Sequence, residues 1–306
     1  MTAPAAAGRP PVPWTRVTWV AWRQYRAALA GVAVLLAALG LYLLIMGLKI
    51  HHAYAAVLAG CHPVGTPLCH QLRHAFDQDY YGTTAGSVGT SGLNAQTVPF
   101  LLLAVPGLIG VFAGAPVIAR ELETGTFRFA WTQGCGRRRW ALSRLALLAA
   151  AVTGAAWAFS LLFSWYFQPF FAEGKTGPFP MQLFGTRGVA FAAWTLAAFA
   201  IAAFAGALIR RTVPAMAAAL AAWTVLDVTT MMTLRQHYLA PLTGHGWNIP
   251  VSVWLLRVWP PRDGVPSYIY QPVSRFWSFQ LIEGGWLLGL ALILLAGTVW
   301  LVRRSE

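Results

Sequence analysis

The stretch that decides the fold is VPFLLLAVPGLIGVFAGAPVIA, residues 98–119, which holds 22 consecutive residues without Asp, Glu, Lys or Arg. A helix that crosses a hydrocarbon layer of about 30 Å needs about 20 apolar residues. This stretch therefore predicts a transmembrane helix.

Five more windows of span length lie on either side of it. Asp227 in the fifth span and Glu283 near the start of the sixth are the only Asp, Glu, Lys or Arg residues in all six windows. The other windows are 27–48, 145–167, 189–209, 213–234 and 281–302. Only 10% of the chain is charged and 58% is hydrophobic, whereas soluble domains carry about 25% charged residues. We expect an all-α membrane protein with six spans, the first too long for a signal peptide.

The distribution of Lys and Arg predicts the orientation. Four segments hold 14 of the 22 Lys and Arg residues, namely 1–26, 120–144, 210–212 and 303–306. Because cytoplasmic loops collect positive residues, we expect both termini in the cytoplasm. Topology and contact with anionic membrane lipids account for the net charge of +13, so no nucleic-acid partner is expected.

The segments outside the spans suggest a single transmembrane domain over residues 13–306, after a disordered Ala- and Pro-rich stretch at 1–12. Residues 13–26 have the pattern of an interfacial elbow helix, with Trp and Arg on opposite faces. Two external loops are long, 49–97 and 235–280. The apolar run 249–259 in the second is too short to span and predicts an interfacial or re-entrant helix.

The loop between the second and third spans is the most informative segment. It reads ARELETGTFRFAWTQGCGRRRWALSRL, residues 119–145. Gly125 would end the second helix and Thr126 would cap a short one, with Phe127 and Trp131 on one face. A solvated basic loop would explain the arginines but not these aromatic residues. An exposed aromatic face predicts a partner protein.

This loop resembles the cytoplasmic loop of the type-2 export permeases of the ATP-binding-cassette (ABC) superfamily. The matching residues are Arg120, Glu121, Gly125, Thr126 and the basic cluster 137–139. The resemblance implies a permease subunit, paired with itself or a close relative in a bacterial plasma (inner) membrane, that docks two ATPase subunits. It also implies export of drug-like, peptide or lipid-like substrates. The coupling residues would be Arg120, Glu121, Glu123, Gly125, Thr126, Phe127, Arg128 and Trp131.

Such a permease needs no nucleotide site of its own. The Gly174-Lys175-Thr176 triplet is not a P-loop, because Pro169 stands where the pattern requires the first Gly. We therefore expect no catalytic residue and no cofactor in this chain, with ATP and Mg bound by the partner ATPase.

Asp227 has two interpretations. An acid inside a span is costly and often marks a transport path. Alternatively, it forms a structural hydrogen bond to a neighbouring span or to Arg187 or Arg235. An ion-coupled secondary transporter that uses Asp227 is the alternative function, but its repeated halves are not visible. A membrane-embedded enzyme would show acids and histidines clustered in the spans. Glu283 is expected at the membrane interface.

Cysteine and histidine residues gather in the first external loop. Cys61 and Cys69 predict a disulfide, which persists only outside the cytoplasm. His70 and His74 could share a helix face, with His62 nearby, but a flexible external loop gives little sign of the three or four ligands and second shell that a metal site needs, so none is expected. The Gly-x-x-x-Gly patterns in the second and sixth spans predict close packing within the bundle.

Overall fold

The computed structural model describes residues 14–62, 65–82, 88–89, 92–93, 95–125, 137–262 and 265–304. Six of its helices are long and apolar enough to cross a membrane. They are Ala30–Gly60, Thr97–Thr124, Arg138–Ala172, Gly188–Ile209, Thr212–His237 and Val273–Arg304. The six predicted spans are therefore confirmed. The stretch 1–12, predicted to be disordered, lies outside the described residues.

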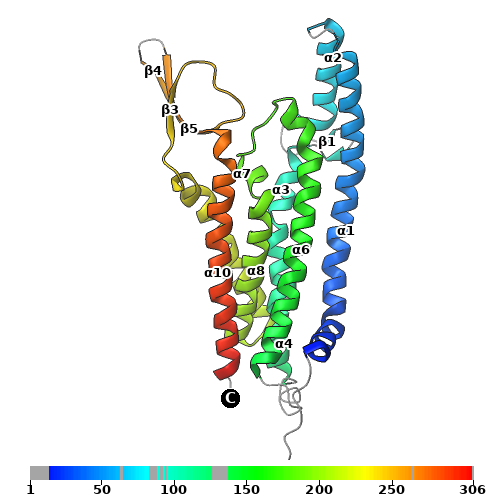
Figure 1. Cartoon of the computed structure of the whole chain (residues 1–306), viewed down its shortest axis with the longest axis vertical. Coiled ribbons are helices and arrows are strands. Elements are labelled where there is room, and N and C mark those ends of the chain that lie inside the picture. Colours follow the sequence, from blue (N-terminus) through cyan, green and yellow to red (C-terminus); the bar gives the residue numbers. More distant parts are fainter. Residues whose placement is uncertain are drawn as a thin grey trace, which may run out of the picture.

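Long helices run side by side along one axis (Figure 1). The helices are α1 Trp14–Gly60, α2 Pro67–Phe76, α3 Thr97–Leu103, α4 Val105–Thr124, α6 Arg137–Ala172, α7 Met181–Phe184, α8 Gly188–Ile209, α9 Thr212–Thr229 and α10 Phe276–Arg304. A π-helical turn, Thr230–Leu234, and a 3-10 turn, Arg235–His237, continue α9. Helix α1 begins and α10 ends at the same end of the bundle (Figure 1). The predicted elbow is the first part of α1, and its interfacial position stays a prediction.

Helices α4 and α8 form the centre of the bundle. In each, 67% of the most apolar window is buried, against 17% in α1 and 22% in α9. A Cβ atom on Gly110 would lie 2.5 Å from the backbone of Ala198, and one on Gly114 would lie 2.6 Å from the carbonyl oxygen of Phe199. The predicted close packing is confirmed for this pair of glycines. A Cβ on Gly285 or Gly289 of α10 would meet no described atom within 4 Å.

An antiparallel sheet stands where the sequence predicted a short helix. Its strands are β3 Leu242–His245, β4 Trp254–Arg262 and β5 Val265–Gln271, in the order β3-β5-β4. The prediction for 249–259 was wrong because this segment has a neighbouring strand to pair with, and its valine and aromatic residues favour strands. A second, two-stranded pair joins β1 Val88–Gly89 to β2 Gly92–Leu93. The fold is predominantly helical, and the prediction of an all-α fold is corrected accordingly.

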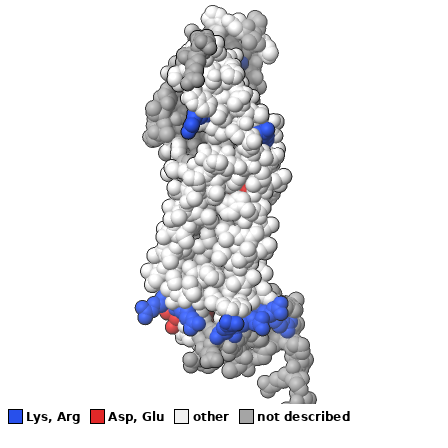
Figure 2. Space-filling model, turned by 90° about the vertical axis from the view of Figure 1, so that its left-hand side faces the viewer, with Lys and Arg blue, Asp and Glu red and all other residues white. Residues whose placement is uncertain are grey.

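The two ends of the bundle differ in chemistry. We call the end where α4 and α10 finish the arginine-rich end, defined by Arg120, Arg138, Arg139, Arg144, Arg210, Arg211, Arg303 and Arg304. In Figure 2, blue side chains gather at this end, directly below a white surface that is almost free of charged residues. We call the opposite end, which carries Cys61 and Cys69, the disulfide end. Helix α1 has 47 residues, about 70 Å at 1.5 Å per residue, so it extends well beyond a bilayer core.

Candidate functional site at the arginine-rich end

The end of α4 carries the first part of the predicted coupling set. Helix α4 stops at Gly125, which has a φ of 70°. Glycine adopts this left-handed conformation at little cost and is the usual residue at such a helix end. Arg120, Glu121 and Glu123 occupy the last two turns before it. Thr126, Phe127, Arg128 and Trp131, the rest of the predicted set, lie outside the described residues.

Glu121 ties α4 to α6 across the predicted coupling loop. Its carboxylate forms an ion pair with Arg144, whose side chain is only 5% exposed. The Arg144 guanidinium also lies over the ring of Trp140, 4.3 Å from its centroid. The helices on either side of the loop are thus joined at its base by a partly buried pair.

Glu123 ties the same end of α4 to the fifth span. Its Oε2 accepts hydrogen bonds from the Thr212 backbone N–H at 2.9 Å and from the Thr212 hydroxyl at 2.7 Å. Thr212 is the first residue of α9, where backbone N–H groups lack helical partners and negative charge is favoured. Arg210, with a φ of 60°, makes the turn that brings this N-terminus there. The end of α4 is therefore bonded both to α6, through Glu121 and Arg144, and to α9, through Glu123 and Thr212.

Asp227 lies on α9 and is partly buried. The two arginines predicted as structural partners of Asp227 contact other groups. Arg235 donates to Glu283, and the Arg187 guanidinium lies 4.2 Å from the ring centroid of Phe171. Burial lowers the pKa of Arg187 to about 10.

Glu283 is fully buried within the bundle, and its predicted level at the membrane interface stays a prediction. Arg235 donates to both carboxylate oxygens, from Nε and Nη2, each at 2.8 Å. The Trp194 indole N–H of α8 donates at 2.8 Å and the Tyr238 hydroxyl at 3.3 Å. The indole N–H of Trp286 donates in turn to the Tyr238 hydroxyl at 2.9 Å. These five residues form the Glu283 cluster, which joins α8, α10 and the end of the fifth span.

A signal for this pair was present in the sequence. Arg235 directly follows the fifth window, and Glu283 is the third residue of the sixth. Consecutive spans run in opposite directions, so the end of one and the start of the next share a membrane level. Opposite charges at such positions satisfy each other away from water. Sequence reasoning considered Arg235 only as a partner for Asp227.

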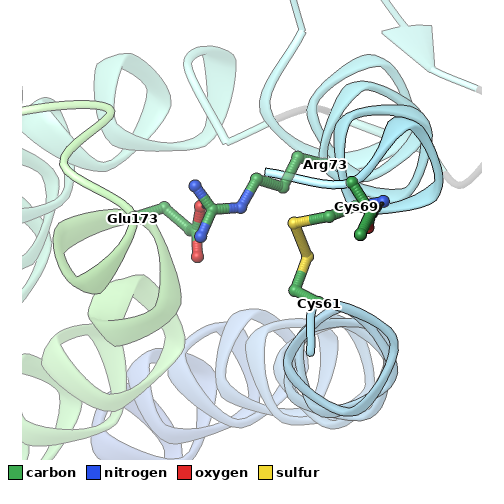
Figure 3. The surroundings of a disulfide bond; sticks show 5 residues. Cys61, Cys69, Arg73 and Glu173 are labelled. Carbon is green, nitrogen blue, oxygen red and sulfur yellow. Dashed lines mark hydrogen bonds and ion pairs between the residues drawn. A yellow bond between two sulfur atoms is a disulfide. The ribbon is translucent and has the colours of Figure 1, made fainter. Parts of the chain in front are cut away.

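The disulfide end is a braced helical hairpin. Cys61 follows α1 and is bonded to Cys69 of α2, the pairing that the sequence predicts. The Thr66 hydroxyl accepts from the Cys69 N–H at 3.2 Å and caps α2. Figure 3 shows Arg73 reaching from the same helix towards Glu173, at the far end of α6, with 3.5 Å between Nε and Oε2. The hairpin is thus fixed both to itself and to the third span.

His70 and His74 lie on the exposed side of α2. Within the described part of the chain, no group of three or more His, Cys, Asp or Glu residues has the geometry to hold a metal ion.

Six apolar helices in one bundle define a multi-pass membrane protein. The family model for "ABC-2 membrane transporter related" proteins matches residues 33–235, well over half of the 306 residues. The chain therefore belongs to this family of ABC transporter transmembrane proteins, as the resemblance of the 119–145 loop predicted. No curated protein and no solved structure matches it. The matched region holds both halves of the predicted coupling loop, Asp227 and Arg235, but ends before Glu283.

Proposed function

We propose that this chain is the membrane subunit of an exporter whose ATP is hydrolysed by separate ATPase chains that dock on the arginine-rich end. The supporting observation is a pair of contacts at the end of α4. Glu121 forms an ion pair with Arg144, and Glu123 accepts hydrogen bonds from Thr212. A push on residues 126–136 would act on α4 and α6 through their joined base and on α9 through its first turn. The loop is therefore suited to transmit motion from a docked protein to three spans.

The proposed orientation places the arginine-rich end in the cytoplasm. Positive residues favour that side, and the disulfide at the opposite end favours an oxidising compartment. Both termini would then be cytoplasmic, in a bacterial inner membrane. ATP and Mg would be bound by the ATPase chains, since the Gly-Lys-Thr triplet of this chain does not fit a P-loop.

The proposed transport path lies along α9. Most residues of this helix are exposed, and most of the exposed ones are apolar, including Val213 and Val225. Asp227 is partly exposed among them, and a carboxylate that faces lipid is costly. A second copy of the chain, or a close relative, would cover this face and form a cavity with Asp227 on its wall. An apolar cavity suits drug-like, peptide or lipid-like cargo.

The test is the variant Phe127→Ala/Trp131→Ala, co-expressed with a candidate ABC ATPase subunit. Truncating one aromatic interface anchor typically costs about 2 kcal/mol or more, roughly thirtyfold in affinity. We expect normal membrane insertion but loss of ATPase co-purification or of substrate-stimulated hydrolysis. Trp247→Ala, at an exposed position on the disulfide end, is the matched control. Full ATPase binding and coupled hydrolysis in the double variant would refute docking through this loop. Transport that persists without any ATPase would favour the ion-coupled alternative.

A further inference from the structure

A groove of about 550 Å³ lies between α6 and α10 at the arginine-rich end. Its walls are apolar and include Leu145 of α6 and Leu295, Ala296 and Trp300 of α10. Two arginines complete the lining, Arg138 at the start of α6 and Arg303 at the end of α10. The groove is thus apolar along its length and cationic at one end.

The cationic end of the groove lies at the arginine-rich end of the bundle. Figure 2 shows the blue side chains of this end in a band below a long surface with almost no charged residues. Arg138 and Arg303 are both exposed. No Asp or Glu is among the described residues that line the groove. The mouth of the groove therefore favours an anion.

The length of the groove matches one leaflet. From Arg303 back to Leu292, the deepest residue on α10, the helix rises about 16 Å at 1.5 Å per residue. One leaflet contributes about half of a hydrocarbon core of about 30 Å. A ligand bound along the groove would thus have a negative head at the interface and an apolar tail that reaches the middle of the bilayer.

We propose that this groove binds an anionic phospholipid of the leaflet at the arginine-rich end. The phosphate would lie between Arg138 and Arg303, and one acyl chain would lie against Leu145, Leu295 and Ala296. Basic sites between transmembrane helices bind such headgroups through charge. A second copy of this face would oppose arginine to arginine, which disfavours a symmetric protein contact. The proposal concerns the lipid-facing side of α6 and α10 and does not depend on ATPase docking.

The experiment measures lipid affinity of the purified full-length protein in a neutral detergent by native mass spectrometry. The probes are phosphatidylglycerol and phosphatidylcholine with identical acyl chains. Each arginine near an anionic headgroup contributes about fivefold in affinity. The variant Arg138→Gln/Arg303→Gln should therefore bind phosphatidylglycerol about 25-fold more weakly, with little change for phosphatidylcholine. Arg138→Lys/Arg303→Lys should retain most of the preference, because lysine also carries a positive charge.

Two matched controls separate this groove from the general basic surface. Arg211→Gln removes an exposed arginine from the same end but outside the groove, and should leave affinity unchanged. Ala296→Trp fills the apolar wall and should weaken binding of both lipids. Ile293→Trp, on an exposed part of α10 that does not line the groove, should weaken neither.

Glycerol phosphate, which lacks acyl chains, distinguishes a lipid site from a free phosphate site. We expect it to bind far more weakly than phosphatidylglycerol, because each buried CH₂ group of a lipid chain adds to affinity. Equal affinity for glycerol phosphate and the lipid would overturn the proposal. Equal affinity of the wild type for the two phospholipids would also overturn it, as would full phosphatidylglycerol binding by the double glutamine variant.

Discussion

Two glutamates hold the two ends of the fifth span, and they do so in opposite environments. At the arginine-rich end, Glu123 is exposed and accepts both of its bonds from Thr212. Beyond the other end of α9, Glu283 is 0% exposed and accepts four bonds from Arg235, Trp194 and Tyr238. The same side chain type therefore makes a water-accessible contact in one place and a dry network in the other.

This difference predicts which end of α9 can move. Breaking a buried ion pair leaves an uncompensated charge in a poorly solvated site. Water replaces the bonds of an exposed carboxylate at little cost. The Glu283 cluster should therefore act as an anchor, while the contact of Glu123 with Thr212 can open and close. A span fixed at one end and released at the other suits the proposed motion.

The largest expected effect comes from breaking the anchor. Glu283→Gln removes the carboxylate opposite Arg235 and should cost about 3–5 kcal/mol of stability, the usual penalty for an orphaned buried charge. Thermal unfolding in detergent measures the loss. Arg235→Met/Glu283→Leu removes both charges and should be more stable than Glu283→Gln alone.

Asp227→Asn is the matched control for that experiment. It removes a partly exposed acid of the same span, so stability should change little while transport falls if the carboxylate lines the path. Wild-type transport by Asp227→Asn would leave this residue without a role in the path. Unfolding of Glu283→Gln at the wild-type temperature would show that the Glu283 cluster is not an anchor.

A smaller effect is expected from the covalent brace of the disulfide end. The bond joins residues separated by 8 positions, and closing so short a loop stabilises by about 2.5 kcal/mol in the chain-entropy description. Cys61→Ser/Cys69→Ser should raise hydrogen exchange in α2 and leave 98–119 unchanged, because the hairpin lies outside the central α4 and α8 pair. Two free thiols in non-reduced peptides of the wild type would contradict the bond itself.

The features that could be predicted from the sequence are those that depend on composition over long windows, namely the transmembrane spans. Val98–Ala119 and its five counterparts could be recognised as spans because lipid requires apolar residues along the whole helix. The strand Trp254–Arg262 was missed because a short apolar run does not distinguish strand from helix without its pairing partner. The charges of Arg235 and Glu283 gave a sequence signal at facing ends of consecutive spans, but their bonding geometry depends on how these spans pack. The contact between Glu123 and Thr212, 89 residues apart, had no sequence signal that we could identify.

The smallest stability effect, and the most informative one for function, is expected at Glu123. Glu123→Ala removes both acceptors of Thr212, but water can reach the exposed N–H and hydroxyl, so the unfolding temperature should stay close to that of the wild type. If α9 receives motion through this contact, the variant should bind its ATPase and hydrolyse ATP while transport falls. Thr212→Ser keeps both donors and should transport normally, whereas Thr212→Val loses the hydroxyl and should be intermediate. Destabilisation of Glu123→Ala as large as that of Glu283→Gln would remove the distinction between anchor and movable contact. Unchanged transport would mean that motion reaches α9 by another route.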